Sequence, residues 1–216
     1  MYSYRPETTG KVEKLSPWGF TDVRKSWTWA GQEGNAVHVL VFSRAEEVTL
    51  ELNGKPVRTL KAGESAREGL PLSFLFELPY EPGELCAVSR TGGKEVSRDT
   101  LVTAGPVHGI RLSGDRTVLP ADGMSAAYVE VELVDAAGNV VPNADVPLRA
   151  SVSGTGAYLA AFGSGNPVTE ENYTRGTFTS YRGRACAIVR SGYEAGQIRL
   201  TVEGGGMKSE LEFTVS

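Results

Sequence analysis

Paired carboxylates are the first candidates for chemistry in this chain of 216 residues. Glycoside hydrolysis uses two such groups, one as an acid and the other as a nucleophile or base. Three pairs are close in the sequence, namely Glu46 with Glu47, Glu130 with Glu132, and Glu170 with Glu171. Glu130 and Glu132 alternate with apolar residues, so we expect them to share the solvated face of a strand and to serve solubility. Glu170 and Glu171 occupy a long polar loop, and functional residues concentrate in such loops, so this is the segment where we expect a function.

Few residues of this chain could support nucleophilic catalysis. The chain holds two histidines: His38 falls within an apolar run typical of a strand, and His108 lies beside a Gly-Pro break. A Ser-His-Asp arrangement would require one of them to be exposed beside a serine, and a packed or surface histidine is the simpler interpretation of both. Motifs of the Gly-x-Ser-x-Gly and nucleotide-binding kinds are absent or lack the helix that they need. We therefore predict no catalytic residue.

The cysteines indicate neither a disulfide framework nor a zinc site. Cys86 and Cys186 are far apart in the sequence, and both lie in strand-like runs. We expect them to be small buried apolar side chains, with a reactive thiol as the alternative. Two cysteines and two distant histidines cannot supply the usual four zinc ligands at short spacing.

Calcium has one candidate cluster at one end of the second predicted domain. It consists of Asp115, Asp122, Asp135 and Asn139. The spacing of these residues matches no known coordination loop. We therefore expect no metal and no cofactor.

Aromatic side chains offer a binding role instead. Trp18, Trp27, Trp29 and Tyr80 could form a flat platform on which the apolar C–H face of a sugar ring stacks. In the alternative interpretation, Trp27 and Trp29 point the same way from an extended segment, because they are two positions apart, and close the open edge or end of the first domain.

Charge and hydropathy argue against two classes of partner. Lysine and arginine number 22 against 26 aspartate and glutamate, a net charge of −4. The chain thus lacks the excess positive charge that binds a phosphate backbone, and nucleic acid is not an expected partner. No window approaches the ~18 apolar residues of a membrane helix, and the polar first residues do not form a secretory signal. A membrane partner is not expected either.

Strands must position these groups, because short runs of period-two alternation dominate the sequence. The predicted strands of the first half are near Val37–Ser43, Val48–Leu52, Lys55–Leu60, Ser73–Leu78, Glu84–Ser89 and Lys94–Thr100. Those of the second half are near Gly109–Ser113, Tyr128–Asp135, Val146–Ser153, Arg184–Arg190, Gln197–Val202 and Ser209–Ser216. Six or seven short strands in about 100 residues are typical of an immunoglobulin-like β-sandwich. The sequence therefore predicts an all-β chain of two consecutive immunoglobulin-like sandwiches, residues 1–103 and 104–216.

Turn residues sharpen this prediction at three positions. Asn53-Gly54 and Gly92-Gly93 predict two-residue hairpins of type I′, which need positive φ at both central residues. Pro147 cannot donate a ladder hydrogen bond, so we expect it at the start or edge of its strand.

The first predicted domain carries phrases that resemble a known family. They are Ser26-Trp27-Thr28-Trp29, the Val-x-Leu-x-Leu-Asn-Gly-Lys run that ends at Lys55, and the Pro-Tyr-x-Pro-Gly-x-Leu run that ends at Leu85. In this order they resemble the non-catalytic domain that follows the barrel in many bacterial β-galactosidases of glycoside hydrolase family 2.

The second predicted domain resembles the bacterial immunoglobulin-like domain that closes those enzymes. The matching phrases are Thr103-Ala-Gly-Pro106, Ala121-Asp-Gly123, Tyr128–Glu132, Asp135–Asn139, Val141-Pro142, Gly163–Pro167, and Gly183 followed by Ala187–Arg190. The ordered series, which covers most of residues 18–206, makes the resemblance specific, since each single phrase is common.

Departures from the family pattern bear on activity. Ser26 and Thr28 stand where the family usually has His and Asn, and Asn166 stands where an Asp is common. The family's general acid lies in an Asn-Glu dipeptide on a barrel strand. This sequence contains no Asn-Glu dipeptide and no alternation of strands and helices.

The resemblance implies a non-catalytic C-terminal region of a β-galactosidase-like enzyme. Its expected partners are the catalytic barrel and the other domains of the parent polypeptide, or a second subunit. The loop that holds Asn166, Glu170, Glu171 and Asn172 is then a candidate rim of the parent's active site. Two alternatives stay open: a carbohydrate-binding module that uses Trp18, Trp27, Trp29 and Tyr80, and spacer or adhesion modules of a surface protein.

Overall fold

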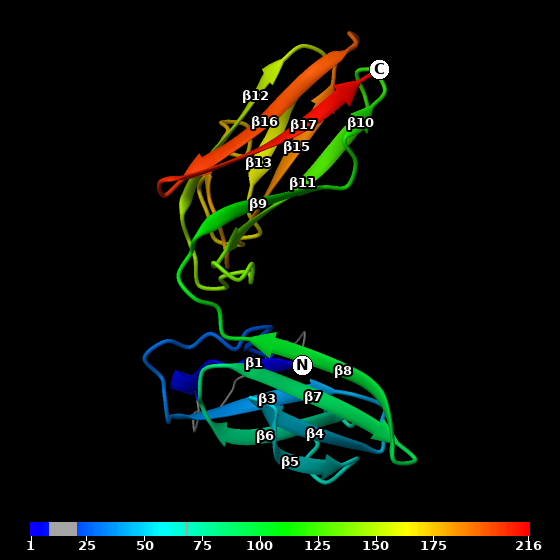
Figure 1. The fold of residues 1–216 in the computed structure, drawn as a ribbon, viewed down its shortest axis with the longest axis vertical. Coiled ribbons are helices and arrows are strands. Elements are labelled where there is room, and N and C mark those ends of the chain that lie inside the picture. Colours follow the sequence, from blue (N-terminus) through cyan, green and yellow to red (C-terminus); the bar gives the residue numbers. More distant parts are fainter. Residues whose placement is uncertain (9–20, 68) are drawn as a thin grey trace. The chain divides into compact units, whose positions relative to one another are not determined.

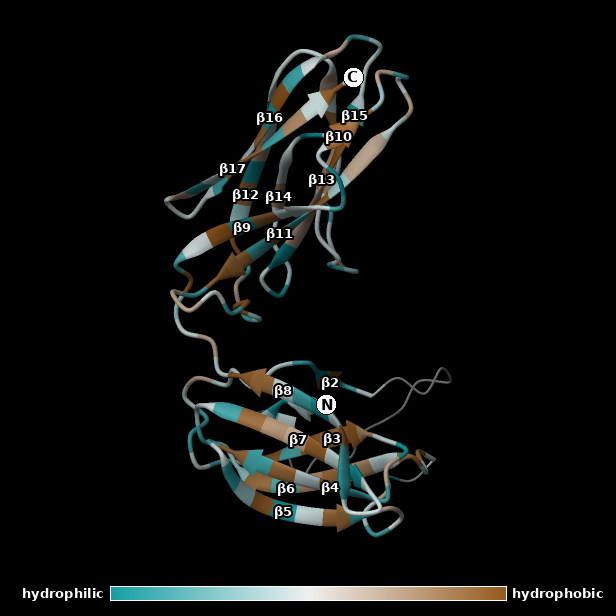
Figure 2. Ribbon diagram, turned by 45° about the vertical axis from the view of Figure 1, so that its right-hand side comes forward, coloured by the Kyte–Doolittle hydropathy of each residue, from teal (hydrophilic) through white to brown (hydrophobic). Residues whose placement is uncertain are grey.

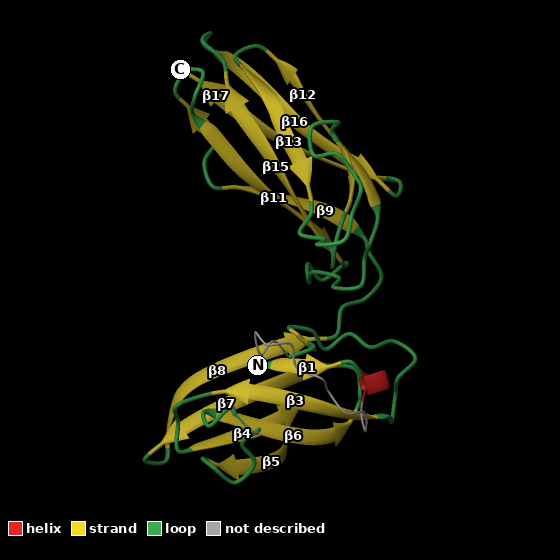
Figure 3. Cartoon of the chain, turned by 180° about the vertical axis from the view of Figure 1, so that it is seen from behind, coloured by secondary structure: helices red, strands yellow, loops and turns green. Residues whose placement is uncertain are grey.

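The computed structural model describes residues 1–8, 21–67 and 69–216. The chain divides into two compact units, Met1–Thr103 and Ala104–Ser216, and strands form both (Figure 1, Figure 3). Helix in the described residues is limited to the short 3-10 turn η1 (Pro6–Thr8). None of the described helices therefore has the length and apolar character of a membrane span.

The first domain consists of two four-stranded sheets with the orders β2-β1-β3-β6 and β5-β4-β7-β8. Their strands are β1 (Tyr2–Tyr4), β2 (Val23–Arg24), β3 (Ala36–Phe42), β4 (Glu47–Leu52), β5 (Lys55–Lys61), β6 (Ser73–Pro79), β7 (Glu84–Thr91) and β8 (Lys94–Val102). Hydrophobic and hydrophilic residues alternate along the strands, as Figure 2 shows, and this alternation gives each sheet an apolar face. Val39 of β3 and Val48 and Leu50 of β4 are fully buried in one core cluster.

Two loops of the first domain contact each other. Asn53 and Gly54 have φ angles of 52° and 74°, so the predicted type I′ hairpin is confirmed. The Asn53 Oδ1 atom accepts a hydrogen bond from the Glu84 N–H at 2.9 Å. Gly83 lies so close that a Cβ atom there would be 1.8 Å from the same oxygen. The second predicted hairpin, at Gly92-Gly93, is confirmed by φ angles of 57° and 74°.

The second domain pairs a five-stranded sheet, β10-β17-β16-β12-β14, with a four-stranded sheet, β13-β15-β11-β9. Their strands are β9 (Gly109–Gly114), β10 (Val118–Leu119), β11 (Ala126–Val134), β12 (Pro147–Gly154), β13 (Ala157–Gly163), β14 (Thr177–Thr179), β15 (Arg184–Ser191), β16 (Gly196–Gly204) and β17 (Met207–Val215). Side chains from both sheets, among them Val129, Phe162 and Leu200, form one buried core cluster. The second domain is thus also a sandwich.

The prediction of an all-β chain with two consecutive sandwiches is confirmed. The ends of each predicted strand agree with the structure to within about two residues, the usual ambiguity of element boundaries. Pro147 is the first residue of β12, as expected. The sequence did not predict β1, β2, β10, β13 and β14. Four of these have two or three residues, and β13 is rich in alanine and glycine, so none shows a clear alternation.

Candidate functional site

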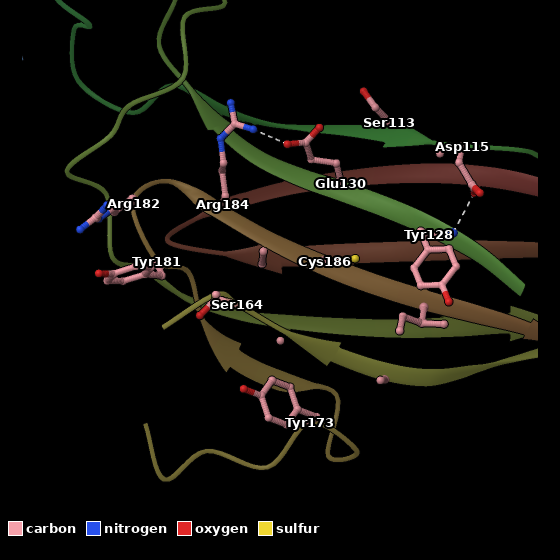
Figure 4. A pocket seen from close by; sticks show the side chains of 16 residues that line it. Ser113, Asp115, Tyr128, Glu130, Ser164, Tyr173, Tyr181, Arg182, Arg184 and Cys186 are labelled. Atoms are coloured by element: carbon pink, nitrogen blue, oxygen red, sulfur yellow. Dashed lines mark hydrogen bonds and ion pairs between the residues drawn. The ribbon is translucent and has the colours of Figure 1, made fainter. Parts of the chain in front are cut away.

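A groove of about 940 Å³ lies on the outer face of the sheet β13-β15-β11-β9 in the second domain (Figure 4). Strand register brings two rows of side chains together on its floor: Tyr128 with Ile188 and Ala161, and Glu130 with Cys186 and Gly163. Their strand neighbours Val129 and Ala187 are fully buried in the core, because successive residues of a strand face opposite sides. Small residues on β13 leave room above the floor.

Three tyrosines border this groove, which we call the tyrosine groove. Tyr128 and Tyr173 expose 55% and 48% of their surfaces, and Tyr181 is half-buried. Figure 4 shows the three rings around the centre of the groove, on β11, on the loop before β14 and on the segment before β15. Aromatic surface is therefore exposed on several sides of one concavity.

Tyr173 is held in place by its neighbours. Its ring stacks on the Phe178 ring with the centroids 4.8 Å apart, and its backbone carbonyl accepts a hydrogen bond from the Phe162 N–H at 2.7 Å. A Cβ atom at Gly163 would be 2.2 Å from the Tyr173 ring. Glycine at 163 is thus what allows this ring to lie over the end of β13.

Glu130 and Arg184, two charged side chains of the groove, form an ion pair. Arg184 contacts Glu130, as drawn in Figure 4, and contacts Glu132 at 2.9 Å. Arg111 contacts Glu132 at 2.7 Å. The expectation that both glutamates lie on a solvated face holds for Glu130 but is wrong for Glu132, which is only 7% exposed. Two guanidinium groups cover Glu132 and satisfy its charge.

Two further polar groups line the groove. The Asp115 carboxylate accepts a hydrogen bond from the Tyr128 N–H at 2.8 Å. The Ser164 hydroxyl is buried and, within the described part of the chain, has no hydrogen-bond partner. A buried hydroxyl without a partner costs free energy, so Ser164 is a candidate contact for a small polar ligand group.

Cys186 is exposed on the groove floor, whereas Cys86 is buried. The prediction of a buried side chain is therefore right for Cys86 and wrong for Cys186, because Cys186 occupies an outward position of β15. Partial burial of the sulfur raises the pKa of the Cys186 thiol, and the negative charges of Glu130 and Asp115 raise it further. The thiolate that a nucleophile requires is thus disfavoured at neutral pH.

The chemistry of this site fits binding better than bond cleavage. Glycoside hydrolysis needs one carboxylic acid in apolar surroundings and a second carboxylate facing it. Asp115 and Glu130 are instead each engaged by a donor of their own domain. Exposed aromatic rings, small floor residues and a few polar groups are the usual lining of a binding site.

The predicted loop lies next to the groove, but most of its polar side chains are engaged within the domain. Glu171 accepts hydrogen bonds from the Thr179 N–H at 2.8 Å and from its hydroxyl at 3.0 Å. Asn166 and Asn172 each accept from the backbone N–H two residues further on. Glu170 is exposed. The placement of this loop at an active-site rim stays a prediction.

The aromatic platform is not present on the surface. Trp27, Trp29 and Tyr80 are 0%, 7% and 2% exposed and belong to the core of the first domain. The Trp27 and Tyr80 rings meet edge to face with centroids 5.1 Å apart, and the Tyr80 hydroxyl accepts from the Trp29 N–H at 3.1 Å. These three rings expose no face on which a sugar could stack, which corrects the platform hypothesis in favour of packing. Trp18 lies outside the described residues.

The four candidate calcium ligands do not form one cluster, although the Asn139 side chain donates a hydrogen bond to Asp135 at 3.2 Å. Asp122 and Asp135 flank β11 at its two ends. The Asp122 carboxylate accepts from the N–H groups of Met124 and Ser125, and Asp135 accepts from the Gly105 N–H at 2.9 Å. Backbone donors thus occupy both carboxylates. The described residues contain no group of three or more His, Cys, Asp or Glu side chains that could hold a metal ion.

Sequence reasoning missed the tyrosines of the groove. For Tyr128 a signal exists, since it precedes Glu130 and Glu132 on the outward positions of an alternating strand, where an aromatic residue is unusual. Tyr173 and Tyr181 lie outside the strands, and only the tertiary structure brings them to the same groove.

Two family models match separate parts of the chain. Residues 110–211 match glycoside hydrolase family 2 C-terminal domain 5. Residues 34–97 match a domain of unknown function, DUF4982. The first match lies within the second structural domain and the second match within the first.

Relatives with both domains are large enzymes. The chain is 30% identical to β-galactosidase BoGH2A of Bacteroides ovatus over 97% of its own length and 23% of that protein. It is 28% identical to a β-galactosidase of Thermoanaerobacter pseudethanolicus over 85% of this chain and 24% of that one. A solved family 2 glycosyl hydrolase from Bacteroides cellulosilyticus superposes with a TM-score of 0.87 at 31% identity, over 99% of this chain and 28% of that one. The chain therefore spans about a quarter of the length of these relatives.

Proposed function

Because the chain consists of two accessory domains of β-galactosidase-like enzymes of glycoside hydrolase family 2, C-terminal domain 5 and DUF4982, we propose that it acts as a non-catalytic region of such an enzyme. In this role it packs on the catalytic barrel and the other domains of the parent polypeptide, or supports an interface between subunits. The loop with Asn166, Glu170, Glu171 and Asn172 then contributes to the rim of the active site.

One observation carries this proposal. The match extends over 97% of this chain but only 23% of the Bacteroides ovatus enzyme, so most of the relative has no counterpart here. The absence of an Asn-Glu dipeptide from the sequence adds support, since the resemblance places the general acid in that dipeptide. The likeness to enzymes also favours this role over that of a surface spacer.

Hydrolysis of a nitrophenyl galactoside by the 216-residue chain tests the non-catalytic part. We expect no release of nitrophenol above that of buffer. Hydrolysis that disappears on a single substitution, such as Glu171→Gln or Glu130→Gln, would overturn this part of the proposal, because it would place a catalytic carboxylate in these domains.

Deletion of this region from the complete polypeptide tests the scaffold part. We expect the truncated enzyme to melt at a lower temperature or to form a smaller oligomer, because an apolar contact surface is lost. Differential scanning calorimetry and light scattering provide the two measurements. An unchanged melting temperature together with an unchanged oligomeric mass contradicts the scaffold role.

A further inference from the structure

We propose that the tyrosine groove binds a segment of a neutral carbohydrate chain. This inference goes beyond the scaffold role and does not depend on it. It also assigns sugar binding to aromatic residues that the structure exposes, in place of the tryptophans that it buries.

The exposed rings offer surfaces on which a sugar can stack. Sugar rings stack their C–H faces on aromatic faces, and this needs accessible rings in fixed positions. Tyr128 and Tyr173 are about half exposed on two sides of the groove. Stacking on Phe178 fixes the Tyr173 ring before any ligand arrives, so little conformational entropy is lost on binding.

The polar groups of the groove offer hydrogen-bond partners to a sugar. Sugar hydroxyls both donate and accept hydrogen bonds, and the groove offers partners of both kinds. The Ser164 hydroxyl is buried without a partner among the described residues. A carboxylate accepts several hydrogen bonds, so Glu130 keeps acceptor capacity beside its contact with Arg184. A sugar hydroxyl that reached Ser164 would relieve an unsatisfied group that an apolar ligand would leave buried.

Charge and size identify the class of sugar. The groove is lined by two carboxylates, Asp115 and Glu130, and by two guanidinium groups, Arg182 and Arg184. Their charges balance, which favours a neutral ligand over a polyuronate or a phosphorylated one. A volume of about 940 Å³ is near the upper end of the roughly 300–1,000 Å³ of small-molecule sites. An open groove of this size suits several linked sugar units.

Isothermal titration calorimetry on the 216-residue chain tests the proposal. The probes are galactotetraose, xylohexaose and cellohexaose, each at up to about 10 mM, because a single stacked ring supports only weak affinity. We expect at least one of them to bind with a one-to-one stoichiometry.

Substitutions locate the binding. Tyr173→Ala and Tyr128→Ala should each weaken the binding about tenfold, which is the loss of one stacking contact. Tyr158→Ala is the matched control, because Tyr158 is 50% exposed on β13 of the same sheet but does not line the groove. It should change the affinity by less than about twofold. Far-UV circular dichroism verifies that each variant is folded.

Alkylation of Cys186 tests the proposal without mutation of an aromatic residue. Cys186 is exposed on the groove floor and Cys86 is buried, so iodoacetamide at alkaline pH should modify Cys186 first. The adduct should abolish sugar binding, and bound sugar should slow the alkylation in turn. The Cys186→Ser variant should bind sugar with and without iodoacetamide treatment.

Three outcomes overturn the proposal. The first is no binding of any of the three oligosaccharides, and the second is binding that Tyr158→Ala weakens as much as Tyr173→Ala. The third is alkylation of Cys186 that slows at high protein concentration without sugar, since this would show that a second copy of the chain covers the groove. None of these results bears on the deletion experiment, so the scaffold role stands or falls separately.

Discussion

At the scale of single residues, Glu132 is a carboxylate that the fold buries between two arginines. Its side chain lies between Arg111 and Arg184, with contacts of 2.7 and 2.9 Å. Removal of one partner from a buried ion pair leaves an uncompensated charge and is costly. Here both arginines are about half exposed, so water compensates part of the loss.

Glu132→Gln should therefore destabilise the second domain by about 1–3 kcal/mol, measured by urea unfolding and far-UV circular dichroism. Glu130→Gln is the matched control, because Glu130 contacts the same Arg184 but is 48% exposed. An exposed pair contributes about 0–1 kcal/mol. Equal effects of the two substitutions would contradict the assignment of a buried role to Glu132.

A second residue links stability to pH. The N–H groups of Ser125 and Met124 and the hydroxyl of Ser125 donate to Asp122, and they hold the pKa of this carboxyl well below its usual value. A group with a depressed pKa stabilises the folded state above its unfolded pKa, and this contribution is lost as the pH falls toward the folded value.

The wild-type unfolding midpoint in urea should consequently fall as the pH is lowered below about 5. Asp122→Ala should have a lower midpoint at pH 7 and a flatter decline in acid, because one of the carboxyl groups with a lowered pKa is gone. Glu194→Ala, at an exposed site in the same domain, should leave the acid branch unchanged. A parallel decline in Asp122→Ala and wild type would show that Asp122 does not contribute to the pH dependence.

At the scale of elements, the loops of the first domain depend on each other. Gly83 has a φ of 140°, and a Cβ atom there would be 1.8 Å from the Asn53 side chain. That side chain in turn accepts from Glu84 N–H and donates to the Pro82 carbonyl. The Asn-Gly and Pro-Gly phrases, which are some thirty residues apart in the sequence, are thus two halves of one contact.

Gly83→Ala should destabilise the first domain by about 3 kcal/mol, through backbone strain and displaced Asn53 hydrogen bonds. Gly93→Ala is the control, because Gly93 also has positive φ but a Cβ atom there would have no neighbour within 4 Å. It should cost about 1 kcal/mol. Tryptophan fluorescence in urea measures both. A Gly83→Ala variant as stable as Gly93→Ala would contradict this account.

The elements also show what the sequence can and cannot predict. Alternation identifies strands such as β4 and β11, because each needs only local information, and Asn53-Gly54 specifies its hairpin in two residues. β1 pairs with β3, from which it is separated by about thirty residues, and no local pattern encodes such a partner. The groove is harder to predict, since Tyr128 and Tyr173 come to line it only through the pairing of strands that are distant in the sequence and the packing of a loop.

For the whole molecule, the two domains have separate cores. The first core holds Trp27 and Phe76, and the second holds Val129 and Phe213. At the boundary, the Thr103 hydroxyl donates to the Trp27 carbonyl at 2.6 Å within the first domain. Each domain thus has the buried apolar cluster that cooperative folding requires.

Fragments Met1–Thr103 and Ala104–Ser216 should therefore each fold cooperatively when made alone. All three tryptophans of the chain precede residue 104, so tryptophan fluorescence reports on the first domain, while far-UV circular dichroism reports on both. In the intact chain the two signals should give different urea midpoints whenever the domains differ in stability. A fragment that shows no unfolding transition would mean that its domain needs the other.

The two faces of β11 and β15 have different roles, one in the core and the other in the groove. Inward residues such as Val129 and Ala187 maintain the core, while outward residues such as Tyr128 and Cys186 form the groove. Outward residues such as Tyr128 and Cys186 can therefore change without loss of the core, whereas Glu132, which is also on the outer face of β11, is buried under two arginines. Substitutions on the outer face can change what the groove binds while the sandwich beneath it is retained. Accessory domains of one fold can in this way diverge to serve enzymes with different substrates.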